Sequence, residues 1–170
     1  SFGVLPAPMH AHLEVTTPTR GTARAAGIDF YVPNFGNHKG FTVNPGTDLL
    51  IPSGIKMEIP EGYMLMAADK SGVVTSKWAC IGAGRTPKLE AFESVVTIGA
   101  KIVDEDYQGE IHIHIINVGK SKVYIKPGMK IAQFILVPVS YEELEEVSAA
   151  DIFSRSSQRG DGALGSTGSY

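Results

Sequence analysis

Apolar residues recur along the chain in short runs that turn-forming residues separate. The segment Ile111-His112-Ile113-His114-Ile115 alternates strictly between apolar and polar positions, which is typical of a strand with one buried face. Turns such as Asn44-Pro45-Gly46 and Lys126-Pro127-Gly128 interrupt the runs. This pattern predicts an all-β domain, built as a sandwich or barrel. The predicted strands cover residues 13–17, 47–51, 54–59, 63–67, 95–98, 110–117, 123–125 and 131–139.

One segment has helical periodicity instead. Tyr141, Leu144 and Val147 recur every third residue, and glutamates fill the positions between them. This spacing predicts one short helix over residues 140–147 with its apolar side facing inward. Residues 78–94 predict no regular element. Beyond residue 154 Ser and Gly dominate, so we predict a β domain over residues 1–153 and a flexible C-terminal arm over residues 154–170.

Composition narrows the class of protein. The chain has 170 residues, of which 43% are apolar and 19% charged, as expected for one globular domain with a real core. The net charge of −3 provides no general basic field, so polymeric nucleic acid is not an expected partner. Neither a bilayer-spanning run nor a signal peptide is visible, so no membrane partner is expected. We predict a soluble, cytoplasmic protein and leave a nuclear or viral origin open.

Two segments have the chemistry of a phosphate site. Residues 159–168 combine an arginine, several glycines and two hydroxyl side chains. Glycines let backbone N–H groups approach an anion, and arginine adds a planar cationic fork. Such a tail could close over a ligand as a lid, although composition alone also fits a simple flexible terminus. Asp69-Lys70-Ser71-Gly72 similarly offers a cation, a hydroxyl and a permissive backbone.

Carboxylates and an aromatic ring suggest hydrolysis next to a nucleoside. Residues 99–111 are predicted to form a hairpin with an acidic turn. Asp104 in this turn could orient and deprotonate a water, and Tyr107 could offer a flat face to a sugar or base. A merely solvated turn is the alternative. Asp29 could either cap a turn or hold Mg²⁺ through the waters of the ion. Gln133 places one amide at the head of an apolar strand.

In their order along the chain, five segments resemble the five motifs of the homotrimeric dUTPases, which hydrolyse dUTP to dUMP and pyrophosphate. The resemblance extends from about Arg24 onward. It implies a distorted β-barrel or jelly roll, Mg²⁺ as cofactor, and a homotrimer with active sites at the subunit interfaces. The C-terminal arm would close an active site of a neighbouring subunit. The segments are Ala26-Gly27-Ile28-Asp29, Lys70-Ser71-Gly72, residues 103–109, Gly128-Met129-Lys130-Ile131-Ala132-Gln133 and residues 159–168.

The resemblance also implies a role for individual residues. Asp104 matches the general base that activates the water attacking the α-phosphorus, and Tyr107 matches the aromatic residue that packs on deoxyribose. Asp29 matches the carboxylate that contacts a water on Mg²⁺. Backbone groups of the hairpin that contains residues 100–104 would read the uracil. The implied substrate-binding residues are Lys70, Ser71, Gly72, Ala100, Lys101, Ile102, Val103, Tyr107, Gln133, Arg159, Leu164, Gly165, Ser166 and Thr167.

Three departures from the family pattern concern the substrate. Lys70 replaces an arginine, Lys101 replaces a glycine of the base-reading hairpin, and Leu164 replaces the aromatic residue that covers the uracil. The phosphate and hydrolysis residues look intact, so we expect altered or relaxed base preference. A pyrophosphatase for dCTP or a modified deoxynucleotide is therefore one alternative, and a non-catalytic trimeric nucleotide-binding module is another. His112 and His114 could form half a metal site, but a surface or interface strand is favoured.

Overall fold

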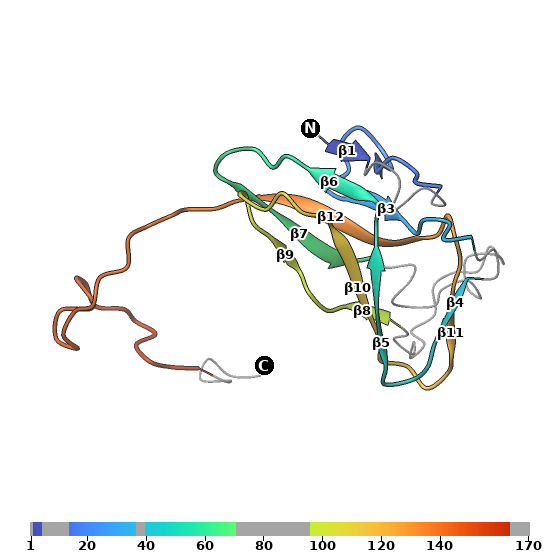
Figure 1. The fold of residues 1–170 in the computed structure, drawn as a ribbon. Helices are drawn as coiled ribbons and strands as arrows, with labels where there is room; N and C mark the ends of the chain where they lie inside the picture. The colour runs from blue at the N-terminus through green and yellow to red at the C-terminus, as the bar shows by residue number, and fades with distance from the viewer. Residues whose placement is uncertain (1, 5–13, 37–39, 71–95, 164–170) are drawn as a thin grey trace. The chain divides into compact units, whose positions relative to one another are not determined.

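The computed structural model describes residues 2–4, 14–36, 40–70 and 96–163 of the chain. The chain forms two compact units, Ser1–Ser140 and Tyr141–Tyr170. All the strands described belong to the first unit, and they pair antiparallel (Figure 1). They are β1 (Phe2–Val4), β2 (Thr19–Arg20), β3 (Ile28–Tyr31), β4 (Phe41–Val43), β5 (Asp48–Pro52), β6 (Ile55–Met57), β7 (Tyr63–Asp69), β8 (Val96–Ile98), β9 (Ile102–Val103), β10 (His112–Asn117), β11 (Val123–Ile125) and β12 (Lys130–Pro138).

The largest sheet has the strand order β2-β3-β12-β7-β9. Its centre is the long apolar strand β12, which pairs with β7 from Ala132↔Asp69 to Pro138↔Tyr63. On the other side β12 pairs with β3, with a register shift between Lys130 and Ala132. Phe134 of β12 packs on Phe30 of β3, with ring centroids 4.4 Å apart. Burial of such aromatic side chains stabilises the fold by roughly 2–3 kcal/mol each.

A three-stranded sheet has the order β5-β10-β8, and two-stranded pairs join β1 to β6 and β11 to β4. In β10 the predicted alternation is confirmed, because Ile113 and Ile115 are buried while His112 and His114 lie on the opposite face. The end of this strand is fixed by Asn117, whose buried side-chain amide donates to the carbonyl of Val43 at 2.9 Å. The faces of β10 therefore follow from the sequence pattern and point both histidines away from the core.

The all-β prediction is confirmed, but the sheets of the described residues do not close into a barrel. The jelly-roll alternative agrees with these separate antiparallel sheets. Residues 13–17 were predicted as a strand, yet their described part contributes only the isolated bridge Glu14↔Asn34. Short strands such as β3 and β4 were missed, since three or four residues carry too little periodicity to be recognised. Residues 78–94 lie outside the described residues.

The predicted helix over residues 140–147 is wrong, because no helix forms there. The side chain of Leu144 is fully exposed, and Tyr141 is 67% exposed. Eight residues are too few for a stable helix unless an apolar face is buried, and here that face meets solvent. Periodicity alone therefore misled the prediction. No helix in the described part of the chain is long and apolar enough to cross a membrane.

Candidate active site

A pocket of about 190 Å³ is lined by residues of β9, the acidic turn and the start of β10. Residues 99–111 were predicted as a hairpin, but β9 and β10 do not pair with each other: β9 pairs with β7 at an edge of the large sheet, whereas β10 belongs to the three-stranded sheet. The acidic turn therefore connects the two sheets. Six of the predicted site residues contribute to this one pocket. The lining residues are Ala100, Lys101, Ile102, Val103, Asp104, Tyr107, Glu110, Ile111, His112 and Phe134.

Two carboxylate residues of the acidic turn, Asp104 and Glu105, have different surroundings. Asp104 follows β9 directly, is exposed and lines the pocket. Its carbonyl accepts the N–H of Tyr107 at 3.2 Å, which closes the turn. The next residue, Glu105, has a carboxylate that accepts the N–H of Gly62 at 2.9 Å and so anchors the turn to the loop before β7. Of these two carboxylate residues, Asp104 is thus the one that lines the pocket.

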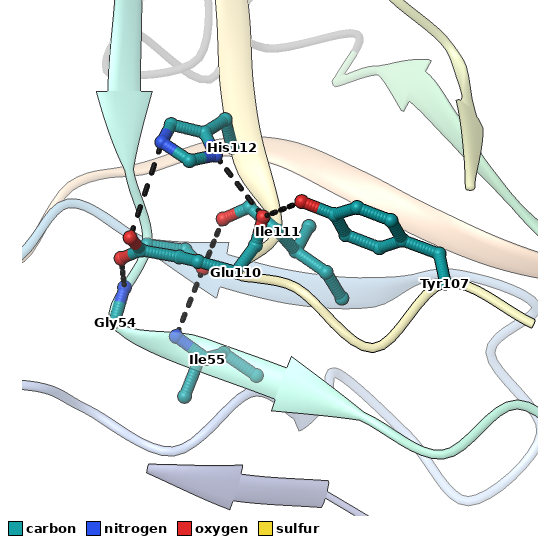
Figure 2. A network of polar contacts seen from close by, with 7 residues as sticks. Gly54, Ile55, Tyr107, Glu110, Ile111 and His112 are labelled. Carbon is teal, nitrogen blue, oxygen red and sulfur yellow. Dashed lines mark hydrogen bonds and ion pairs between the residues drawn. The ribbon is translucent and has the colours of Figure 1, made fainter. Parts of the chain in front are cut away.

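Tyr107 is held by a network of polar contacts that Figure 2 shows. Its hydroxyl donates to the carbonyl of Glu110 at 2.8 Å, and His112 Nδ1 lies 3.0 Å from the same carbonyl. The Glu110 carboxylate accepts the N–H of Gly54 at 2.9 Å. A Cβ at Gly109 would lie 2.4 Å from the Tyr107 hydroxyl oxygen, so the ring depends on glycine there. These contacts fix a half-exposed aromatic face at the wall of the pocket.

The backbone along the opposite wall is also fixed. The carbonyl of Lys101 accepts the N–H of Ala67 at 2.7 Å, and the N–H of Ala100 donates to Nδ1 of His114 at 3.0 Å. Strand β9 pairs with β7 through Leu65↔Val103. The wall formed by residues 100–103 therefore has a defined backbone conformation, as a site that reads a ligand through main-chain groups requires.

A second cluster joins residues from three of the predicted motifs. Asp29 on β3 is paired in register with Gln133 on β12. Its Oδ1 lies 2.6 Å from Nζ of Lys70, and its Oδ2 lies 3.7 Å from Nζ of Lys130. The Gln133 amide donates to the carbonyl of Asp69 at 2.8 Å. Asp29 is only 7% exposed, so its charge is compensated mainly by lysines.

Arg159 lies in the second unit and participates in a local turn. Its Nε–H donates to the carbonyl of Gly162 at 2.8 Å, and Gly160 has a positive φ of 55° that favours glycine. The other predicted residues of the phosphate segments lie outside the described residues. They are Ser71, Gly72, Leu164, Gly165, Ser166 and Thr167.

The chain matches the family model for dUTPase over residues 67–168. It belongs to the dUTPase family. A mouse deoxyuridine 5'-triphosphate nucleotidohydrolase is 33% identical over 153 residues, covering 90% of this chain and 78% of the mouse protein. A mitochondrial human relative is 34% identical over 153 residues, or 90% of this chain, and the chain spans 50% of its length. A mutant dUTPase of Staphylococcus bacteriophage 80alpha with dUpNHpp shares the fold, with a TM-score of 0.73 and 22% identity, over 99% of this chain and 97% of the phage chain.

The structure places the predicted dUTPase residues in two groups. Asp104, Tyr107 and the wall of residues 100–103 share the pocket, whereas Asp29, Lys70 and Gln133 gather around the β3–β12–β7 strands and do not line it. In the described residues no three His, Cys, Asp or Glu side chains gather as a metal site. A single carboxylate fits Mg²⁺ that is held through its waters, with the direct ligands coming from substrate phosphates.

His114 makes two contacts that the sequence did not predict. Its Nε2 lies 2.8 Å from Oδ2 of Asp48, and its Nδ1 accepts the N–H of Ala100. The hydrogen bond with His114 lowers the pKa of Asp48 below its ordinary value. Alternation in β10 correctly predicted that the imidazole leaves the core, but Asp48 is 66 residues away. No local pattern connects the two residues.

Proposed function

We propose that this chain hydrolyses dUTP to dUMP and pyrophosphate, with Asp104 as the general base for the water that attacks the α-phosphorus. One observation carries the proposal: Asp104, Tyr107 and the hydrogen-bonded wall of residues 100–103 line the same pocket. A base, a flat ring and a main-chain edge are the three groups that hydrolysis of a nucleotide needs at one place. The neighbouring Glu105 is bound to Gly62, which leaves Asp104 for the water.

The nucleoside would enter the pocket between Tyr107 and the wall of residues 100–103. Tyr107 offers its ring to deoxyribose, where close packing disfavours a 2′-hydroxyl, and the backbone of residues 100–103 faces the base. The side chain of Lys101 is exposed at this wall while its carbonyl is bound by Ala67. An ammonium group beside the base would favour acceptor groups on the ligand, and this would be the physical basis of the altered base preference that we expect.

The triphosphate would lie near the second cluster. Lys70, Ser71, Gly72 and Gln133 would contact phosphate oxygens, and the Arg159 guanidinium with Ser166 and Thr167 would hold the γ-phosphate. Mg²⁺ would neutralise charge on the triphosphate as the pentacovalent centre forms. Asp29 would hold this ion through water. Its pairing with Lys70 and Lys130 keeps the carboxylate oriented toward the phosphate-binding lysine.

We also propose a homotrimer. In the part of the chain that the structure describes, the pocket of Asp104 and Tyr107 is not lined by Asp29, Lys70 or Gln133, which favours a complete site assembled from neighbouring subunits. The arm of residues 154–170 would close over a neighbour's pocket. Leu164 would cover the base with an apolar side chain, and the backbone N–H of Gly165 would donate to a phosphate oxygen. Hydrolysis should therefore depend on assembly, and sedimentation of the active species gives its subunit count.

The deciding experiment is pyrophosphate release with Mg²⁺ from dUTP, dCTP and 5-substituted dUTP. Asp104→Asn should reduce turnover by about 10²–10⁴-fold. Asp106→Asn is the matched control, because Asp106 is exposed in the same turn and does not line the pocket. Full activity of Asp104→Asn would overturn the role of Asp104. Preferred turnover of another deoxynucleotide would keep the mechanism and change the substrate, and binding without any turnover would indicate the non-catalytic module.

A further inference from the structure

The geometry points to His114 as a positioning residue that holds the base-reading wall of the pocket through the backbone of Ala100. This inference rests on the proposed function, in which residues 100–103 face the base. His114 does not line the pocket. It would act on the base only through the main chain, so its effect should appear in substrate affinity more than in the chemical step.

The imidazole makes two directed contacts that fix its orientation. Nδ1 lies 3.0 Å from the N of Ala100 and accepts its N–H, so Nδ1 carries no proton. The ring hydrogen is then on Nε2, which lies 2.8 Å from Oδ2 of Asp48 and donates to this carboxylate. Asp48 therefore selects the tautomer that Ala100 needs. The negative charge of the carboxylate strengthens this hydrogen bond.

Gly99 provides the space that this arrangement needs. A Cβ on Gly99 would lie 2.1 Å from Nδ1 of His114 and 2.4 Å from Cε1, so any side chain at position 99 would displace the ring. The N–H of Gly99 also donates to the backbone carbonyl of His114 at 2.9 Å. Both the main chain and the side chain of His114 thus hold residues 99 and 100 at β10.

The consequence for the pocket follows from peptide geometry. The bond from Ala100 N–H to His114 fixes the peptide plane between residues 99 and 100. The bond from Ala67 N–H to the Lys101 carbonyl fixes the plane between residues 101 and 102. The peptide group between Ala100 and Lys101 lies in the chain between these two fixed peptide groups. Because each peptide group is planar, fixing its two neighbours restricts its orientation. Loss of the His114 contact would release one of the planes and let this part of the wall rotate.

Two amide substitutions separate the contacts of His114. Asparagine places its side-chain oxygen near the position of Nδ1 and can accept the Ala100 N–H, but it does not reach Asp48. Glutamine places its side-chain NH₂ near the position of Nε2 and can donate to Asp48, but it offers no acceptor at Nδ1. His114→Asn and His114→Gln are therefore a matched pair of similar polarity, each keeping one contact and losing the other.

Steady-state hydrolysis of dUTP by the full chain gives the main test. His114→Asn should keep KM within about twofold of the unsubstituted chain. His114→Gln should raise KM by about three- to tenfold, which is the effect of one lost hydrogen bond, with kcat nearly unchanged because Asp104 is untouched. Equal KM values for the two variants would overturn the inference. So would a KM increase in His114→Asn alone, since that would assign the effect to Asp48.

The backbone amide of Ala100 gives a readout that is independent of activity. Its hydrogen exchange should stay protected in His114→Asn and become faster in His114→Gln, whereas a merely structural role would change both variants together. If the unsubstituted chain fails to hydrolyse dUTP but the Ala100 amide responds in this way, the proposed function fails and the His114 contact stands. If dUTP is hydrolysed and neither substitution changes the hydrogen-exchange rate of the Ala100 amide, the inference alone fails.

Discussion

Nζ of Lys70 lies 2.6 Å from Oδ1 of Asp29, which joins the first and second dUTPase motifs across the large sheet. Lys130 approaches the other carboxylate oxygen at 3.7 Å. A carboxylate that is 7% exposed loses much of its hydration, and its charge must be compensated by nearby cations. The pair thus keeps together the lysine that we propose for phosphate and the carboxylate that we propose for Mg²⁺.

Removal of the Asp29 charge should weaken the response to Mg²⁺. In Asp29→Asn the amide can no longer attract the waters of the ion as a carboxylate does. We expect the Mg²⁺ concentration for half-maximal pyrophosphate release to rise by roughly ten- to hundredfold, as for other outer-shell metal partners. Asp106→Asn serves as the control of equal charge change. An unchanged Mg²⁺ titration would place the ion elsewhere.

The effects of substituting Lys70 and Asp29 on the free energy of unfolding should be coupled. Lys70→Met leaves Asp29 with the more distant ammonium of Lys130, 3.7 Å from Oδ2, and we expect a loss of about 1–3 kcal/mol in the free energy of unfolding. The double variant Lys70→Met/Asp29→Asn should lose less than the sum of the single variants, because no buried charge is left uncompensated. Urea denaturation of the four proteins measures this coupling, and strict additivity would argue against the pair.

The ring of Tyr107 should depend on Gly109. In Gly109→Ala the new methyl group would overlap the Tyr107 hydroxyl and push the ring out of its contact with Glu110. We expect KM for dUTP to rise by about tenfold, on the scale of one lost ring contact and hydrogen bond. Gly21→Ala is the matched control, since a Cβ on Gly21 meets no atom within 4 Å. Equal KM values in the two variants would contradict the proposed role of the ring.

Asp48 should titrate in a way that depends on His114. The hydrogen bond from His114 lowers the pKa of Asp48 from its ordinary value of 3.8. Because the folded chain holds this carboxylate ionised more strongly than the unfolded chain does, Asp48 contributes stability above about pH 3.8. This contribution is lost as the pH falls below that value and passes through the folded pKa.

Carbon-detected NMR of the Asp48 carboxyl measures this directly. In His114→Ala we expect the pKa to return toward 3.8, since the donor is gone. His112→Ala is the matched control, because His112 lies on the same face of β10 but its ring contacts Glu110. An equal shift of the Asp48 pKa in both variants would indicate a general change of the fold.

Much of the β architecture was predictable because β7, β10 and β12 are long enough to display their pattern. In β10 each alternate isoleucine is buried, so the assignment of its two faces needed only the sequence. The helix over residues 140–147 failed for the opposite reason: its spacing was helical, but Leu144 meets solvent. A local pattern predicts an element reliably only where a packing partner buries the apolar face.

The sequence by itself determined which chemical groups the chain carries, their order as dUTPase motifs, and the side of β10 on which its histidines lie. Only the tertiary structure decided that Lys70 pairs with Asp29, that Glu105 anchors to Gly62 while Asp104 lines the pocket, and that His114 connects Asp48 to Ala100. Periodicity records the local environment of each residue. Contacts between distant residues depend on strand register, and a shift of one residue would turn each side chain to the other face of its sheet.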